Sequence, residues 1–295
     1  MITVTKNLQE TEFIHRRFIL KKTKSLLCLL FAFIIMTASS MSAYAADITQ
    51  LTEPQDIVTA GYNPYSTEGQ SRSIIGDDGR VTVGSPASYP YSAIAFLSIK
   101  FSCGCSGVGN GFMVSKNCML TAGHCVVCED HGNDAASITA TFGYQSSSNY
   151  LARVTATPSN SVIYHDPQFT GTQKNYDYGY VVFNTNVGNT TGWFGLASRS
   201  DSTLDGMNIS VSGYEGLTLK RSDGNVTSVA TNRVKYDADT VEGQSGSPVY
   251  FNDSTNGYLV VAIHTDGTDL INWKNSGWRV TSTFINELRS LGYVS

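Results

Sequence analysis

Residues 239–250 read DTVEGQSGSPVY, and the interpretation of the whole chain starts from this stretch. Ser245 lies between Gly243 and Gly246, and glycine allows the backbone to adopt positive φ and to approach a bound group closely. The N–H groups of Gly243 and Ser245 can then converge on one point. Such a pair stabilises the oxyanion that forms when a serine hydroxyl attacks a carbonyl group. Taken alone, the segment could equally be an ordinary turn of Gly and Ser.

Two further segments supply the partners that a nucleophilic serine requires. Residues 119–125, MLTAGHC, place His124 directly after a strand-like run. A serine hydroxyl is a weak nucleophile until an adjacent imidazole accepts its proton. Residues 175–183, NYDYGYVVF, place Asp177 just before an apolar strand, where a buried carboxylate can accept the Nδ1 proton of that imidazole. We therefore predict a catalytic triad of His124, Asp177 and Ser245.

The order of these residues along the chain distinguishes between unrelated folds that share the same chemistry. The order His, Asp, Ser is typical of chymotrypsin-like enzymes, whereas α/β-hydrolases have Ser, Asp, His. Short β-rich runs separated by Gly, Asn, Ser and Asp recur along the chain, with no long helical pattern between them. This spacing predicts an all-β fold. One amphipathic helix is expected at the C-terminus, from the spacing of Phe284, Ile285, Leu288 and Leu291.

The segments TAGHC, NYDYG and DTxxGQSGSPV resemble the glutamyl endopeptidases, the V8-type branch of the chymotrypsin-like serine proteases. The resemblance implies two six-stranded antiparallel β-barrels, formed by residues 73–188 and 189–295, with the triad between them and the helix at the end of the second. It also implies peptide cleavage after Glu. Thr240 and His264 match the family positions that donate hydrogen bonds to the carboxylate of a bound Glu.

Several alternatives to this reading stay open on the sequence alone. Asp239 precedes the pocket residue Thr240, and an acid at the base of the pocket would select Lys or Arg, so trypsin-like or relaxed specificity is an alternative. A preference for Asp over Glu and a non-catalytic secreted binding module are others. Gln244 replaces the acid that pairs with the new N-terminus in trypsin-type enzymes, so that ion pair is unavailable for activation.

The first 72 residues predict export and processing. Basic residues between Arg16 and Lys24 precede the apolar run LLCLLFAFIIM, and Ala43-Tyr44-Ala45 satisfies the A-x-A cleavage rule. We therefore expect a signal peptide at 1–45, a propeptide at 46–72 and a secreted, extracellular enzyme. A Glu-specific enzyme should not cut after Arg, so another protease is expected to activate it at Arg72-Ser73.

Cysteine content and charge limit the partners. Five cysteines remain after removal of the signal peptide, and an oxidising compartment predicts disulfides among them, in an unknown pairing: Cys103, Cys105, Cys118, Cys125 and Cys128. Because Cys125-x2-Cys128 lies near His124 and His131, zinc is the alternative, but we expect no metal and no cofactor. The net charge is −4 and no basic stripe occurs. We expect protein or peptide substrates, no nucleic acid, no membrane association and a monomer.

Overall fold

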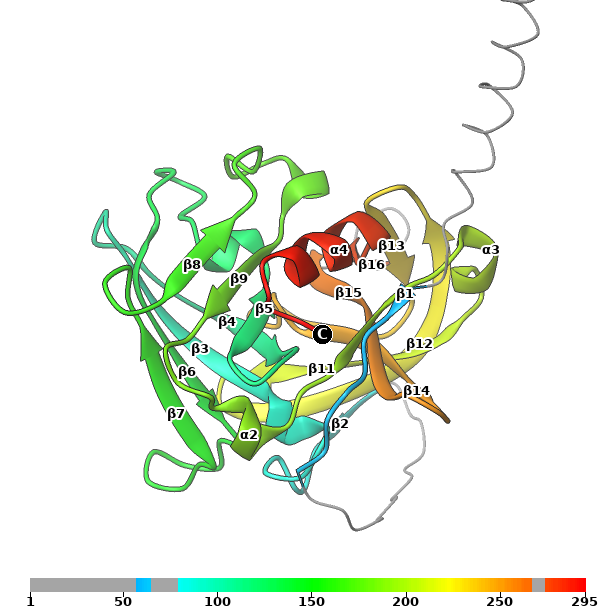
Figure 1. Cartoon of the computed structure of the whole chain (residues 1–295), viewed down its shortest axis with the longest axis horizontal. Helices are drawn as coiled ribbons and strands as arrows, with labels where there is room; N and C mark the ends of the chain where they lie inside the picture. Colours follow the sequence, from blue (N-terminus) through cyan, green and yellow to red (C-terminus); the bar gives the residue numbers. More distant parts are fainter. Residues whose placement is uncertain (1–56, 65–78, 267–273) are drawn as a thin grey trace, which may run out of the picture. The chain divides into compact units, whose positions relative to one another are not determined.

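The computed structural model describes residues 57–64, 79–266 and 274–295 (Figure 1). All of them belong to the unit Pro54–Ser295. The predicted signal peptide at 1–45 and the predicted activation site Arg72-Ser73 lie outside the described residues. Within the part that the structure describes, no helix is long and apolar enough to cross a membrane.

The first sheet has seven antiparallel strands and carries the segment that ends in His124. Its core follows the two-residue period of a strand, because Leu97, Ile99 and Phe101 are buried whereas Ser98 and Lys100 are exposed. The strands are paired in the order β7-β6-β3-β4-β5-β9-β8, which forms a half-barrel. Their bounds are β3 (Ile94–Phe101), β4 (Ser106–Met113), β5 (Cys118–Thr121), β6 (Ala135–Phe142), β7 (Ala152–Ala156), β8 (Val162–His165) and β9 (Gly179–Val182).

The second sheet contains a closed barrel of six strands. The path β15-β14-β11-β12-β13-β16 returns to its start because β16 also pairs with β15. These strands are β11 (Asn208–Glu215), β12 (Thr218–Val229), β13 (Arg233–Tyr236), β14 (Pro248–Asp253), β15 (Gly257–Asp266) and β16 (Asn275–Arg279). The predicted all-β, chymotrypsin-like class is therefore confirmed. The predicted count of six holds for this ring, whereas the first sheet has seven strands in an open order.

Three further strands extend the second sheet. Strand β10 (Gly195–Ser198) pairs in parallel with β15, and β2 (Arg80–Thr82) pairs with β12. Strand β1 (Ile57–Val58), which falls inside the predicted propeptide, pairs with β10 in antiparallel orientation. Strands β1 and β2, which both precede residue 83, thus complete the second sheet. The boundary between residues 188 and 189 stays a prediction.

An aromatic cluster between the two sheets holds the start of β9, directly after Asp177. The ring of Tyr178 stacks on Trp278 of β16 with 4.0 Å between ring centroids, and Phe284 meets both rings edge-on. Trp278 Nε1 donates a hydrogen bond to the carbonyl oxygen of Asn175, at 3.0 Å. The second sheet therefore fixes the backbone on both sides of Asp177.

Helix α4 (Ser282–Ser290) supplies Phe284 and confirms the predicted terminal helix. Phe284, Ile285 and Leu288 are buried as the apolar spacing predicts, but Leu291 is 47% exposed. The prediction for Leu291 is wrong because the helix ends at Ser290 and Gly292 turns the chain with a φ of 73°. The smaller elements are η1 (Tyr91–Ala93), η2 (Gly123–Cys125), η3 (Lys174–Tyr176), α2 (Gly188–Thr191) and α3 (Asp201–Leu204).

We predict that Thr281→Ala destabilises the protein by about 1 kcal/mol, the usual effect of losing an N-cap. Thr281 Oγ1 accepts a hydrogen bond from Phe284 N at 3.2 Å and satisfies an N–H group of the first turn of α4. The free energy of unfolding in denaturant measures the loss. Thr283→Ala is the matched control, since Thr283 is exposed inside the same turn. Equal effects of the two substitutions would contradict the capping role.

Candidate active site

His124 lies in the single turn η2, which follows β5 directly. Its predecessor Gly123 is closely surrounded, because a Cβ there would stand 3.1 Å from both Asp177 Oδ1 and Tyr178 N. This close approach brings the backbone of the turn against the start of β9. The glycine of the TAGHC segment thus favours the contact between His124 and Asp177.

The structure brings His124 and Asp177 together in the predicted geometry. His124 Nδ1 lies 2.8 Å from Asp177 Oδ2 and 3.1 Å from Oδ1, and the backbone N–H of His124 donates to Oδ1 at 3.0 Å. Burial alone would lower the pKa of His124, but the charge of Asp177 and its hydrogen bond outweigh burial and raise that pKa above 6.5. Asp177 is buried, with 3% of its surface exposed.

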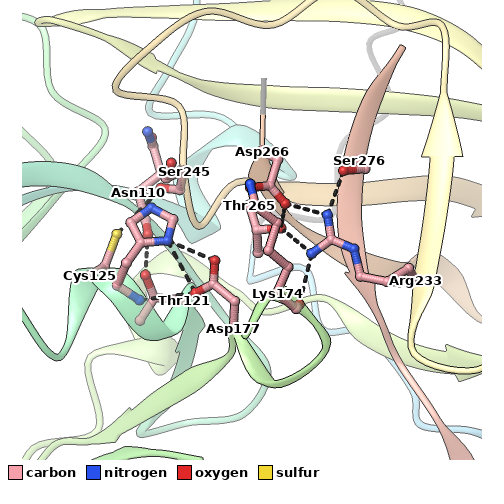
Figure 2. A network of polar contacts seen from close by, with 11 residues as sticks. Asn110, Thr121, Cys125, Lys174, Asp177, Arg233, Ser245, Thr265, Asp266 and Ser276 are labelled. Carbon is pink, nitrogen blue, oxygen red and sulfur yellow. Dashed lines mark hydrogen bonds and ion pairs between the residues drawn. The ribbon is translucent and has the colours of Figure 1, made fainter. Parts of the chain in front are cut away.

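Ser245 belongs to the same site through its backbone. Its carbonyl oxygen accepts a hydrogen bond from Asn110 N at 2.7 Å, and Cys125 Sγ, next to His124 in the chain, lies 3.8 Å from that oxygen. On the other side of the serine, Gly246 N donates to the carbonyl oxygen of His264 at 2.7 Å. Figure 2 shows Asp177, Cys125 and Ser245 around the imidazole ring that Asp177 holds.

The two glycines that flank Ser245 have the positive φ angles that the sequence predicts. They are 88° at Gly243 and 85° at Gly246, and a Cβ at Gly246 would stand only 2.0 Å from the carbonyl oxygen of Asn110. Among the described residues, no hydrogen bond engages the N–H groups of Gly243 and Ser245. The two predicted oxyanion donors are therefore available to a bound group.

Asn110 is the site residue that the sequence reasoning missed. It is completely buried in β4, and its side-chain nitrogen donates to the carbonyl oxygens of Gly243 at 2.8 Å and Tyr214 at 3.1 Å. Its side-chain oxygen accepts from Tyr214 N at 2.7 Å. Asn110 sits in the glycine-rich run GVGNGF, where Asn-Gly indicates a turn rather than a polar anchor.

Gln244 stabilises the turn that precedes the nucleophile candidate. Its side chain donates to the carbonyl oxygen of Gly213 at 3.1 Å and accepts from Val241 N at 2.9 Å. The residue is 2% exposed. These bonds inside the second barrel occupy both the oxygen and the nitrogen of the Gln244 side-chain amide.

His264 and Thr240 lie on either side of the Ser245 segment in the second barrel. His264 is 2% exposed, and Tyr236 Oη lies 2.6 Å from its Nδ1. Burial, with smaller contributions from the charges of His124 and Arg233, lowers the pKa of His264 to about 4. Thr240 Oγ1 is buried without a hydrogen-bond partner among the described residues. A buried hydroxyl without a partner is costly, so a water molecule or a bound group is needed to complete its hydrogen bonding.

Asp266, two residues after His264, is the centre of a group of ion pairs. Asp266 pairs with both Lys174 and Arg233, so two cations face one anion, and Arg233 also donates to Thr265 Oγ1 at 2.9 Å (Figure 2). Burial alone would raise the pKa of Asp266, but Lys174 and Arg233 lower it below its ordinary value. The carboxylate of Asp266 is thus already neutralised by its neighbours.

Asp239 holds two distant segments of the chain together, and this structural role is the alternative to a role in a substrate pocket. The residue is exposed, and its Oδ2 accepts a hydrogen bond from Gly79 N at 2.9 Å, 160 residues earlier in the chain. Its own N–H donates to Ser222 Oγ at 2.8 Å. Asp239 therefore fastens the segment before β2 to the second barrel.

In the structure the five cysteines form neither the predicted disulfides nor the ligand set that the sequence suggested for zinc. All five are free thiols in the structure, which therefore contains none of the predicted disulfides: Cys103, Cys105, Cys118, Cys125 and Cys128. Among the described residues, the group that could hold a metal ion is Cys103, Cys105, Cys128 and His131. Neither Cys125 nor His124 belongs to it, because Cys125 faces the Ser245 segment and His124 is held by Asp177.

Comparisons with known proteins agree with this geometry. Residues 109–263 match the family model of the trypsin-like peptidase domain. An extracellular metalloprotease of Bacillus subtilis is 38% identical over 226 residues, which cover 75% of this chain and 70% of that protein. The glutamyl endopeptidase of Bacillus licheniformis is 32% identical over 236 residues, which cover 76% of this chain and 69% of that protein. A solved structure of a Glu endopeptidase in complex with MPD has a TM-score of 0.61 and 29% identity, covering 75% of this chain and 99% of that one.

We predict that Asp177→Asn lowers the pKa of His124. The carboxylate stabilises the imidazolium, so its removal leaves burial as the dominant effect, and burial favours the neutral ring. An NMR titration of the histidine ring signals measures both proteins. The His124 signal should titrate above 6.5 in the natural protein and below 6.5 in the variant. An unchanged pKa would show that Asp177 does not control this imidazole.

Proposed function

The chain belongs to the glutamyl endopeptidase branch of the chymotrypsin-like serine peptidases and is a serine endopeptidase, and from this premise we propose that it is an exported enzyme that cleaves peptide bonds after Glu. The catalytic roles fall to His124, Asp177 and Ser245. The observation that carries the specificity is the buried, unpartnered hydroxyl of Thr240 in the segment that leads to Ser245.

In the proposed reaction Ser245 attacks the carbonyl carbon of the substrate while His124 accepts the proton of its hydroxyl group. The N–H groups of Gly243 and Ser245 stabilise the resulting oxyanion. His124 then passes the proton to the nitrogen of the leaving amine, the C–N bond breaks, and an acyl-enzyme remains. A water molecule gives its proton to His124 and attacks the ester carbonyl, which releases the acid and restores the Ser245 hydroxyl. Asp177 orients the ring and stabilises its charged form throughout.

Because only neutral His124 can accept a proton, the rate should fall as the solution becomes acidic. The raised pKa of His124 places this loss above pH 6.5, with full activity on the alkaline side. His264 is neutral over the same range because burial holds its pKa near 4. The acid limb of kcat/KM therefore reports His124 and not the pocket histidine.

A Glu side chain fits the chemistry around Thr240 and His264. Burying a carboxylate is costly unless donors and positive charge compensate it. The Thr240 hydroxyl is a donor without another partner among the described residues, and Arg233, which pairs with Asp266, supplies positive charge close to His264. A bound carboxylate would also raise the pKa of His264 and so strengthen a hydrogen bond from the imidazole ring to that carboxylate.

The alternative specificities lack such support. A trypsin-like pocket needs an unpaired acid, yet Asp239 is exposed and bonded to Gly79 N, and Asp266 is neutralised by Lys174 and Arg233. The name of the metalloprotease relative suggests a catalytic metal. In this chain, however, the described group of Cys and His residues that could hold a metal contains neither His124 nor Ser245. A non-catalytic binding module would not need the buried pair of His124 and Asp177.

We further propose that residues 1–45 direct export and that another protease cleaves at Arg72-Ser73. The segment of β1 supports a folded proenzyme, because Thr59 donates and accepts hydrogen bonds with the backbone of Leu196. Tyr62 also stacks on Trp193, with ring centroids 4.3 Å apart. Cleavage after residue 72 would leave this strand attached to β10 by non-covalent contacts alone. The enzyme is proposed to act as an extracellular monomer on protein and peptide substrates.

We predict that the mature enzyme, acting on one denatured protein, produces fragments that end in Glu. Sequencing of the new C-termini by mass spectrometry measures the preference directly, and it separates Glu from Asp. Fragments ending in Lys or Arg would contradict the proposed specificity while leaving the serine mechanism intact. Absence of cleavage together with failure of a fluorophosphonate to label Ser245 would contradict the proposed catalytic role of that serine.

We predict that Thr240→Val lowers kcat/KM for a Glu substrate by about 10- to 100-fold, the equivalent of one hydrogen bond to a charged group. For the matching Gln substrate the loss should be several-fold smaller, because the charge is absent. Thr255→Val is the matched control, since Thr255 is exposed in the turn between β14 and β15. An unchanged ratio of Glu to Gln rates would exclude Thr240 from the pocket.

A further inference from the structure

We propose that Cys103, Cys105, Cys128 and His131 bind one zinc ion in a closed structural site that joins the hairpin between β3 and β4 to the loop after His124. Their ligand atoms lie within 4.8 Å of one another. Nothing in the triad or the pocket uses these four residues. The site is thus separate from the serine chemistry.

The distances match tetrahedral zinc coordination. His131 Nδ1 lies 3.5 Å from Cys105 Sγ and 3.5 Å from Cys128 Sγ. A zinc ion with Zn–S bonds of about 2.3 Å and Zn–N bonds of about 2.0 Å separates sulfur from nitrogen by about 3.5 Å at the tetrahedral angle. Zinc can therefore enter without a change in the spacing of His131 and these two sulfurs.

Two tight turns position the ligands in advance. The hairpin turn that carries Cys103 and Cys105 is closed by the hydrogen bonds from Gly104 N to Phe101 O, at 3.0 Å, and from Phe101 N to Cys105 O, at 2.9 Å. The second turn is closed by Cys128 N to Asn133 O, at 2.9 Å, and Gly132 N to Cys128 O, at 2.7 Å. Gly104 and Gly132 have φ angles of 92° and 65°, which glycine adopts without strain.

The chemistry of the ligands selects zinc and a structural role. Thiolate and imidazole ligands suit zinc, whereas magnesium and calcium require oxygen ligands. Four protein ligands fill the tetrahedron and leave no position for water or substrate, as in structural zinc sites of the Cys3His type. The ion would stabilise the fold and would not act on a peptide bond.

A disulfide accounts for this cluster less well than a metal ion. The cluster has three thiols, so any one bridge between Cys103, Cys105 and Cys128 leaves a third thiol and His131 without a role. A zinc ion uses all four groups at once. Cys118 and Cys125 are buried outside the cluster, and neither belongs to its ligand set.

The site also bears on the position of His124. Cys128 follows the catalytic histidine by four residues, and Val127 N donates to Gly123 O at 3.0 Å. The hairpin reaches the same loop from the other side, since Ser102 N donates to Asp134 O at 3.0 Å. Zinc would therefore hold both ends of the loop that leaves η2, and its loss would loosen the turn that presents His124.

The test uses the exported chain purified without chelators, in the Ser245→Ala background so that self-digestion does not interfere. Elemental mass spectrometry should find about one zinc per chain. The variants Cys105→Ser and His131→Ala should each lose at least ten-fold in zinc content at equal protein. Cys118→Ala removes a buried thiol of β5 and should keep the full content. A chelator should lower the thermal midpoint of the Ser245→Ala protein but not that of the Cys105→Ser variant.

Thiol counting by intact mass separates zinc from a disulfide. Alkylation in denaturant with a chelator and no reductant should modify all three cluster cysteines. A zinc content below about 0.1 per chain, even after incubation with zinc, would overturn the proposal. A peptide mass two hydrogens lower, which joins two of the three cysteines, would overturn it as well. Both results are independent of whether the enzyme prefers Glu, so failure here leaves the proposed function untouched.

Discussion

The site depends on one buried asparagine side chain that joins the two sheets to the nucleophile segment. Asn110 lies in β4 of the first sheet, bonds both backbone groups of Tyr214 in β11 of the second, and holds the carbonyl of Gly243. Its own N–H holds the carbonyl of Ser245, and its own carbonyl accepts from Thr121 Oγ1 at 2.6 Å. Each unpaired buried group would cost about 1–3 kcal/mol, so the arrangement is stable only when all of these bonds form together.

This constraint explains why residues far apart in the chain share one active site. Because the carbonyls of Gly243 and Ser245 are bonded to Asn110, the backbone on both sides of Gln244 is held in place, and among the described residues no hydrogen bond engages the N–H groups of Gly243 and Ser245. The segments that carry His124 and Asp177 border strands of the first sheet, and the segment that carries Ser245 leads into β14 of the second. The aromatic stack of Tyr178 and Trp278 fixes the same two sheets from the side of Asp177. Two independent contacts between the sheets thus set the geometry of one reaction.

The contact between His124 and Asp177, the fold class and the terminal helix were predictable because each depends on a short local pattern with its own chemical reason. Asn110 was not, since its role comes from contacts with residues more than 100 positions away, and Asn-Gly usually indicates a turn. The ligand set considered as the zinc alternative, Cys125 and Cys128 with His124 and His131, does not come together for a similar reason. Cys125 and Cys128 are neighbours in sequence, yet the short turn η2 directs Cys125 toward Ser245, and the hairpin of β3 and β4 supplies the other two sulfurs. The ion pairs of Asp266 with Lys174 and Arg233 also could not be predicted, because they join three separate elements, η3, β13 and β15.

The most direct test of this account is the steady-state kinetics of Asn110→Ala with a peptide substrate. If Asn110 holds the backbone of Gly243 and Ser245 in the position that aims their N–H groups at an oxyanion, kcat should fall by about 10²–10³, the cost of one lost oxyanion donor, while KM stays within a few-fold. Asn117→Ala is the control, because it also removes an asparagine, from the turn between β4 and β5, but breaks only a side-chain hydrogen bond to Phe183 O at 3.3 Å. A folded Asn110→Ala enzyme with the kcat of the control would contradict the central role of this side chain.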